Sequence, residues 1–97
     1  MRKSYLLVYS NKVGSRSTVK NTLDSMDEVN TWRYDLDNCF IVVSESSAKE
    51  LSQSFRSFSE HKTGRFIFSE IPSNNWGWLS SRAWFLIKHK KLKPKDE

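Results

Sequence analysis

Apolar and polar residues follow one another with two different periods along the chain, and the changes of period divide it into strands and helices. Short runs rich in β-branched and aromatic residues predict strands, whereas apolar residues three or four positions apart predict helices. The segments predicted to be strands are residues 5–10, 31–34, 39–44 and 65–71. The segments predicted to be helices are residues 14–26, 47–58 and roughly 76–88.

The first two predicted helices carry N-terminal caps. Ser15 or Ser17 can accept hydrogen bonds from the free amides of the first helix. Ser47 and Glu50 form the S-x-x-E capping box of the second helix. The residues predicted to face inward are Val19, Leu23 and Met26, then Ala48, Leu51, Phe55 and Phe58, and in the third helix Leu79, Ala83, Leu86 and Ile87.

The order of elements predicts the fold class. Residues 35–38, Asp-Leu-Asp-Asn, form a turn between the second and third strands, because Asp and Asn bond nearby backbone groups. The resulting order is βαββαβ with an added C-terminal helix. This is a ferredoxin-like α+β arrangement, a four-stranded antiparallel sheet with two helices on one face. The 97 residues predict one domain, residues 1–90, followed by a basic, flexible tail at 91–97.

The predicted sheet is apolar on both faces. In the first strand Leu6 and Val8 can face the two helices, which leaves Tyr5, Leu7 and Tyr9 on the far face. Which set faces inward stays open, since a slip of one residue exchanges the faces. An uncovered apolar face needs a partner. The candidates for a dimer interface are Tyr5, Leu7, Tyr9, Phe66, Phe68, Trp76, Trp78 and Trp84.

Three kinds of cover are possible for the second face. The third helix can cover it within its own subunit, or a second copy can pack sheet on sheet about a two-fold axis. Alternatively, nucleobases stack on it, as in RNA-recognition domains. Residues 64–68, Gly-Arg-Phe-Ile-Phe, partly echo the motif of those domains, but the basic residue follows the glycine and the motif lies on the fourth strand. In that alternative, bases stack on Tyr9 or Phe66.

Net charge is +5, and it is concentrated at one end. Residues 88–97 hold five lysines against two acidic residues, which indicates a tail able to attract an RNA or DNA backbone. A solvated terminus is the simpler explanation. The candidates for nucleic-acid contacts are Lys88, Lys90, Lys91, Lys93, Lys95, Arg16 and Arg65.

The remaining candidate chemistry is sparse. Cys39 is the only cysteine and begins a strand, which favours a small buried side chain over a nucleophile. One cysteine and two histidines without metal-ligand spacing predict no metal site and no cofactor. No apolar run approaches the ~18 residues of a membrane span, and no signal peptide is evident. We therefore expect a cytoplasmic protein without a membrane partner.

The first strand, the hairpin "WRYDLDNCFIVV", the helix start "SAKEL" and the segment "WGWLSSRAWFLIK" together resemble a known family. It comprises small ferredoxin-like proteins related to the non-integrase, endoribonuclease-like subunit of the CRISPR spacer-adaptation complex. The likeness is to stand-alone bacterial members unlinked to CRISPR function, and it covers roughly residues 4–90. The resemblance implies a homodimer in which two sheets pack face to face.

The resemblance also directs attention to the end of the first strand. Nuclease members of that family carry an aspartate there, and two symmetry-related aspartates are thought to hold Mg²⁺. The matching position here is Ser10, followed by Asn11. A hydroxyl supplies neither the charge nor the affinity that Mg²⁺ needs. Asp35 and Asp37 are better explained by the turn.

These observations lead to one preferred hypothesis and two alternatives. The preferred function is a non-catalytic homodimeric interaction protein with weak, sequence-independent affinity for nucleic acid. The first alternative is a metal-dependent endonuclease of the family type with displaced acidic ligands, which would use Mg²⁺. The second is a monomeric RNA-binding domain. The missing acid at Ser10 favours the hypothesis without catalysis.

Overall fold

The computed structural model describes residues 1–59 and 63–91. Its strands and α-helices are β1 (Lys3–Tyr9), α1 (Arg16–Ser25), β2 (Val29–Leu36), β3 (Cys39–Ser44), α2 (Ala48–Phe58), β4 (Phe66–Glu70) and α3 (Ser81–His89), with a 3-10 turn, η1 (Asn11–Val13), after β1. The predicted α+β class and the βαββαβ order with a C-terminal helix are confirmed.

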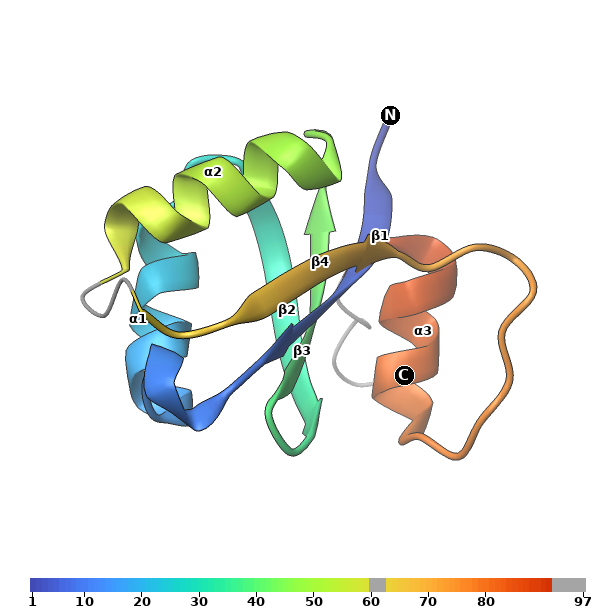
Figure 1. The fold of residues 1–97 in the computed structure, drawn as a ribbon. Helices are drawn as coiled ribbons and strands as arrows, with labels where there is room; N and C mark the ends of the chain where they lie inside the picture. The colour runs from blue at the N-terminus through green and yellow to red at the C-terminus, as the bar shows by residue number, and fades with distance from the viewer. Residues whose placement is uncertain (60–62, 92–97) are drawn as a thin grey trace.

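The sheet has four antiparallel strands in the order β2-β3-β1-β4. The first strand lies at the centre, where Leu7 pairs with Phe40 on β3 and with Phe68 on β4. This arrangement is consistent with a ferredoxin-like fold. Figure 1 shows α1 and α2 on one side of the sheet and α3 on the other, so the described chain has three layers.

The larger core lies between the sheet and the pair α1 and α2. Phe40 is fully buried there and contacts the rings of Tyr9, Trp32 and Tyr34. Phe55 of α2 packs edge-to-face on the ring of Phe68, 5.7 Å away between centroids. The other buried members of this core are Tyr5, Leu7, Val13, Val19, Leu23, Met26, Val42 and Leu51.

The smaller core lies on the opposite face, beneath α3. Ile41 and Val43 of β3 pack against Ala83, Leu86 and Ile87 of α3. The third helix therefore packs on the sheet of its own chain. Strand β3 is buried along its whole length because helices cover both of its faces.

The structure shows which side chains of β1 face the two helices, a question that the sequence leaves open. Tyr5, Leu7 and Tyr9 face α1 and α2, while Leu6 packs in the smaller core on the α3 side. The hydroxyl of Tyr5 donates to the Ser46 carbonyl at 2.6 Å, which fixes this ring at the end of the larger core. Tyr5, Leu7, Tyr9 and Phe68 are each at most 5% exposed, so these four dimer candidates do not lie at the surface.

The predicted caps of the first two helices are confirmed. Ser15 accepts a hydrogen bond from the Thr18 amide, and Ser47 and Glu50 form both bonds of the capping box. Of the residues of α2 predicted to face inward, Phe58 does not, because it is 51% exposed.

The third helix begins five residues later than predicted, at Ser81. Its N-cap is Ser80, whose side chain accepts from the Ala83 amide at 3.2 Å. The segment before it is irregular, so Trp76 and Trp78 lie in a loop rather than on a helix. Among the described residues, no helix is long and apolar enough to cross a membrane.

Candidate interaction surface

The end of β1, at Ser10 and Asn11, is a polar clamp between strands. The Ser10 amide donates to the Arg65 carbonyl at 2.8 Å, and the Ser10 hydroxyl accepts from the Arg65 amide at 3.0 Å. Beside it, the Asn38 side-chain amide donates to the Tyr9 carbonyl and to the side chain of Asn11. Ser10 and Asn11 thus join the ends of β1 and β4 and the β2–β3 turn.

No metal-binding cluster accompanies this clamp in the part of the chain that the structure describes. Over residues 1–59 and 63–91 there is no group of three or more His, Cys, Asp or Glu side chains able to hold a metal ion. The carboxylate of Asp35 accepts two hydrogen bonds from Ser80 at the start of α3. The thiol of Cys39 is buried, and burial raises its pKa, which disfavours the reactive thiolate.

An apolar row crosses the sheet on its α3 side, beyond the reach of α3. Leu36 of β2 pairs with Cys39 of β3, Cys39 pairs with Val8 of β1, and Val8 pairs with Ile67 of β4. Leu36, Val8 and Ile67 are 46%, 45% and 60% exposed, whereas Cys39 between them is buried. Helix α3 hides Ile41 and Val43 further along, but it leaves the other three members of the row open to solvent.

A loop of residues 71–80 joins β4 to α3 beside this row, and we call it the tryptophan loop. Figure 1 shows it as the orange segment that bows away from the sheet before it reaches α3. Trp76 and Trp78 are each 92% exposed, and a Cβ added at Gly77 between them would meet nothing within 4 Å. Trp84, on α3, is half-buried against the smaller core.

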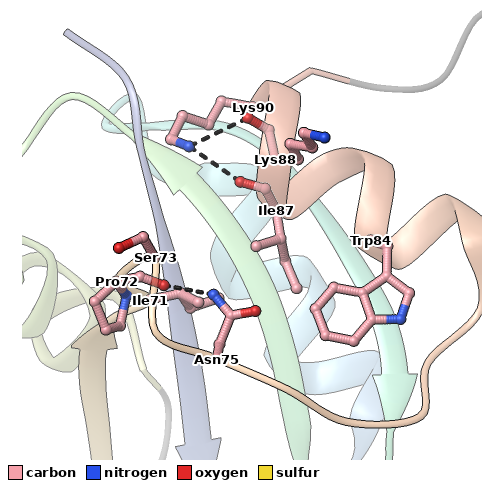
Figure 2. Close-up of a pocket in the computed structure, with 8 residues that line it drawn as sticks. All are labelled: Ile71, Pro72, Ser73, Asn75, Trp84, Ile87, Lys88 and Lys90. Atoms are coloured by element: carbon pink, nitrogen blue, oxygen red, sulfur yellow. Dashed lines mark hydrogen bonds between the residues drawn. The ribbon is translucent and has the colours of Figure 1, made fainter.

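A groove of about 450 Å³, which we call the lysine groove, separates the start of this loop from the end of α3 (Figure 2). Its walls carry Asn75, Trp84, Lys88 and Lys90, together with Ile71, Pro72, Ser73 and Ile87. The ammonium group of Lys90 donates to the Ile87 carbonyl at 3.0 Å, so it also caps α3. The Arg2 guanidinium donates to the Lys90 carbonyl at 3.1 Å and adds a third cation at this end.

The predicted cationic residues do not form one surface. Arg16 lies on α1, with its guanidinium 4.7 Å from the centre of the Tyr34 ring, and α1 covers the face of the sheet opposite α3. Arg65 directly precedes β4, and of the predicted cationic residues only Lys88 and Lys90 line the lysine groove. Lys91 follows them, whereas Lys93, Lys95 and the rest of the predicted tail at 92–97 lie outside the described residues.

Tyr9 and Phe66, the two aromatic residues predicted to stack on RNA bases, do not lie on an open face of the sheet. Tyr9 is 5% exposed beneath α1, and the half-buried Phe66 packs edge-to-face on Phe55 of α2 at 4.8 Å. Base stacking on these two rings stays a prediction, and the structure shows both rings packed on the side of the sheet that α1 and α2 cover. The residues that sequence reasoning missed are Leu36, Val8 and Ile67.

Comparison with protein-family models, with curated proteins and with solved structures finds no match to this chain.

Proposed function

We propose that this chain is a non-catalytic ferredoxin-like interaction protein that acts as a homodimer. The observation that supports this proposal is the apolar row of Leu36, Cys39, Val8 and Ile67. Three of its members, Leu36, Val8 and Ile67, remain exposed although α3 covers the rest of that face. Contiguous exposed apolar surface of this kind is typical of interaction sites.

A second copy is a suitable cover for this row because the row runs straight across four strands. Two such sheets can pack face to face about a two-fold axis, so that each row lies on its own counterpart. The family that the sequence resembles also pairs two sheets in this way. The resemblance therefore agrees with the proposal, although the order of elements alone does not identify the family.

Replacing one apolar residue of the row by an acid tests the dimer. Glutamate at Ile67 places a charge in the proposed interface, so Ile67→Glu should convert the dimer to a monomer at micromolar concentration. Phe58→Glu is the matched control, because Phe58 is similarly exposed but lies on α2, on the other side of the sheet. Light scattering after size-exclusion chromatography should give about twice the 11.4 kDa chain mass for the wild type and the control. A wild-type monomer would remove the dimer from this proposal.

Weak binding of nucleic acid is a second candidate, supported by the lysine groove. Lys88 and Lys90 bring two cations to one groove beside the ring of Trp84. Phosphate contacts are electrostatic, so the affinity for a fluorescent single-stranded oligonucleotide should fall as the salt concentration rises. In a plot of log affinity against log salt concentration, the slope should become shallower by about 0.7 for each contact removed. Lys88→Gln should reduce this slope, whereas Lys49→Gln on α2 should not. Equal slopes for the two variants would exclude the groove.

The endonuclease alternative stays a prediction without support from the described residues. The hydroxyl at the family position, Ser10, is bonded to the Arg65 amide. Incubation with labelled single- and double-stranded RNA and DNA, with Mg²⁺ or Mn²⁺ and then with chelator, tests it. Cleavage that disappears with chelator would favour this alternative over the non-catalytic one.

A further inference from the structure

An apolar hollow of about 290 Å³ lies directly beside the apolar row. Its floor comes from Leu6 and Leu36 of the sheet, and its walls come from Leu79 and Trp84. Trp76 and Trp78 stand at its rim and remain almost fully exposed. The same surface therefore presents both an empty apolar hollow and two unburied indole rings.

The tryptophan loop carries no charge. Residues 71–81, Ile-Pro-Ser-Asn-Asn-Trp-Gly-Trp-Leu-Ser-Ser, contain no Asp, Glu, Lys, Arg or His. Two copies of such a loop meet without like-charge repulsion, and depletion of charge is typical of the core of a protein interface. Cations suited to nucleic acid or to an anionic lipid surface lie outside this loop, at Lys88 and Lys90 of the lysine groove.

The loop is held at both ends, so its indoles are presented from a fixed base. At its start the Ile71 amide donates to the Ser4 carbonyl at 2.8 Å, and the side chain of Asn75 bonds to the Pro72 carbonyl. At its end Ser80 donates twice to the carboxylate of Asp35. A preorganised loop loses less conformational entropy when its side chains bind.

We propose that two copies of this chain exchange their tryptophan loops, so that an indole of each copy occupies the apolar hollow of the other. This inference rests on the proposed homodimer and names the residues that hold it together. The arrangement is self-complementary, as a two-fold interface must be, because one surface carries both the inserted groups and their receptor.

The size of the hollow fits this occupant. An apolar cavity of about 150 Å³ accepts a benzene ring, so a hollow nearly twice as large has room for the two fused rings of an indole. Tryptophan is also enriched among the residues that dominate binding energy at protein interfaces.

The two indoles supply about half of the area that a stable dimer buries. An aromatic side chain buries about 150–250 Å², so two indoles give about 300–500 Å² from each chain. A specific interface buries about 800 Å² per partner. Leu36, Val8 and Ile67 lie beside the indoles on the same surface and supply further apolar area toward that value.

A complementation experiment tests the exchange. The loop variant carries Trp76→Ala and Trp78→Ala, and the hollow variant carries Leu36→Asp. Each should be monomeric where the wild type is a dimer, with the dissociation constant raised by more than about tenfold. An equimolar mixture should recover a heterodimer, because the loop variant keeps the floor of the hollow, Leu6 and Leu36, and the hollow variant keeps both indoles. Phe58→Ala is the control, since it removes an exposed ring from the opposite side of the sheet.

The possible outcomes separate this inference from the homodimer itself. A loop variant that remains a dimer overturns the exchange, while the dissociation caused by Ile67→Glu would still support the proposed homodimer. A mixture without heterodimer also overturns the exchange, and the recovered heterodimer shows in the same measurement that both variants are folded. A wild-type monomer overturns both proposals. Indole emission that shifts only with oligothymidylate or phosphatidylglycerol vesicles, and not with protein concentration, overturns the exchange alone.

Discussion

The carboxylate of Asp35 accepts two hydrogen bonds from Ser80, one from its amide at 3.2 Å and one from its hydroxyl at 2.8 Å. Ser80 in turn caps α3 by accepting from the Ala83 amide. This contact joins the end of β2 to the start of α3 across 45 positions of sequence. It therefore decides where the tryptophan loop ends and where the helix that covers the second face begins.

Replacing Ser80 by alanine should destabilise the chain by about 1–2 kcal/mol, because an N-cap and the bonds to Asp35 are lost together. For a domain of this size the melting temperature should fall by about 4–8 °C per kcal/mol. Ser81→Ala is the matched control, because Ser81 is exposed in the first turn and does not cap the helix. Equal melting temperatures for the two variants would show that the Asp35–Ser80 contact does not hold α3.

Gly64 should be intolerant of any side chain. A Cβ at this position would lie 2.5 Å from both the amide nitrogen and Cγ2 of Val13, which is buried in η1. Because backbone cannot move aside easily, Gly64→Ala should cost about 1–3 kcal/mol of unfolding free energy.

Gly77→Ala is the natural comparison for Gly64→Ala in urea unfolding. A Cβ at Gly77 meets nothing within 4 Å, so this variant should stay within about 0.5 kcal/mol of the wild type. A larger loss from Gly77→Ala than from Gly64→Ala would contradict the packing of residue 64 against η1.

Local signals predicted the elements of this fold well. The strand at Cys39–Ser44 and the capping box of Ser47 and Glu50 both follow from short stretches of sequence, and both are found as predicted. The face of β1 did not follow, because its strand is apolar at every position from Tyr5 to Tyr9. Alternation along a strand cannot show which side chains face the core when both sets are apolar.

The place of Leu36 in the exposed row was missed because the register between β2 and β3 shifts beside it. Tyr34 and Leu36 are two positions apart and should share one face of β2, but the register shifts between them. Tyr34 consequently packs against the larger core, whereas Leu36 lines the hollow on the α3 side. Leu36 also lies between two aspartates, in a segment where the sequence predicts a turn. Only the structure therefore shows that its side chain belongs to the surface row.

The clamp at the end of β1 should contribute to stability and not to metal binding. Ser10→Ala removes the acceptor of the Arg65 amide and should cost about 0.5–1.5 kcal/mol, the net value of one hydrogen bond. Ser17→Ala, an exposed position on α1, should change the unfolding free energy much less. Adding Mg²⁺ or chelator should leave the melting temperatures of the wild type and both variants unchanged. Stabilisation by Mg²⁺ that disappears in Ser10→Ala would contradict this role.

Asp24 should make the fold sensitive to acid. Its carboxylate accepts from the Trp32 indole N–H at 2.7 Å and from the Lys20 ammonium at 3.0 Å, and these bonds hold the pKa of Asp24 below its ordinary value of 3.8. A carboxyl with a lowered pKa in the folded state stabilises the fold fully above 3.8, and this contribution is lost as the pH falls through the lowered value. Urea unfolding across this range should therefore show a smaller loss of stability on acidification for Asp24→Asn than for the wild type.

Trp32→Phe, which removes the indole N–H and keeps a ring, should also make the loss of stability on acidification smaller. Parallel pH profiles for the wild type and Asp24→Asn would show that the contact between α1 and β2 contributes nothing to stability.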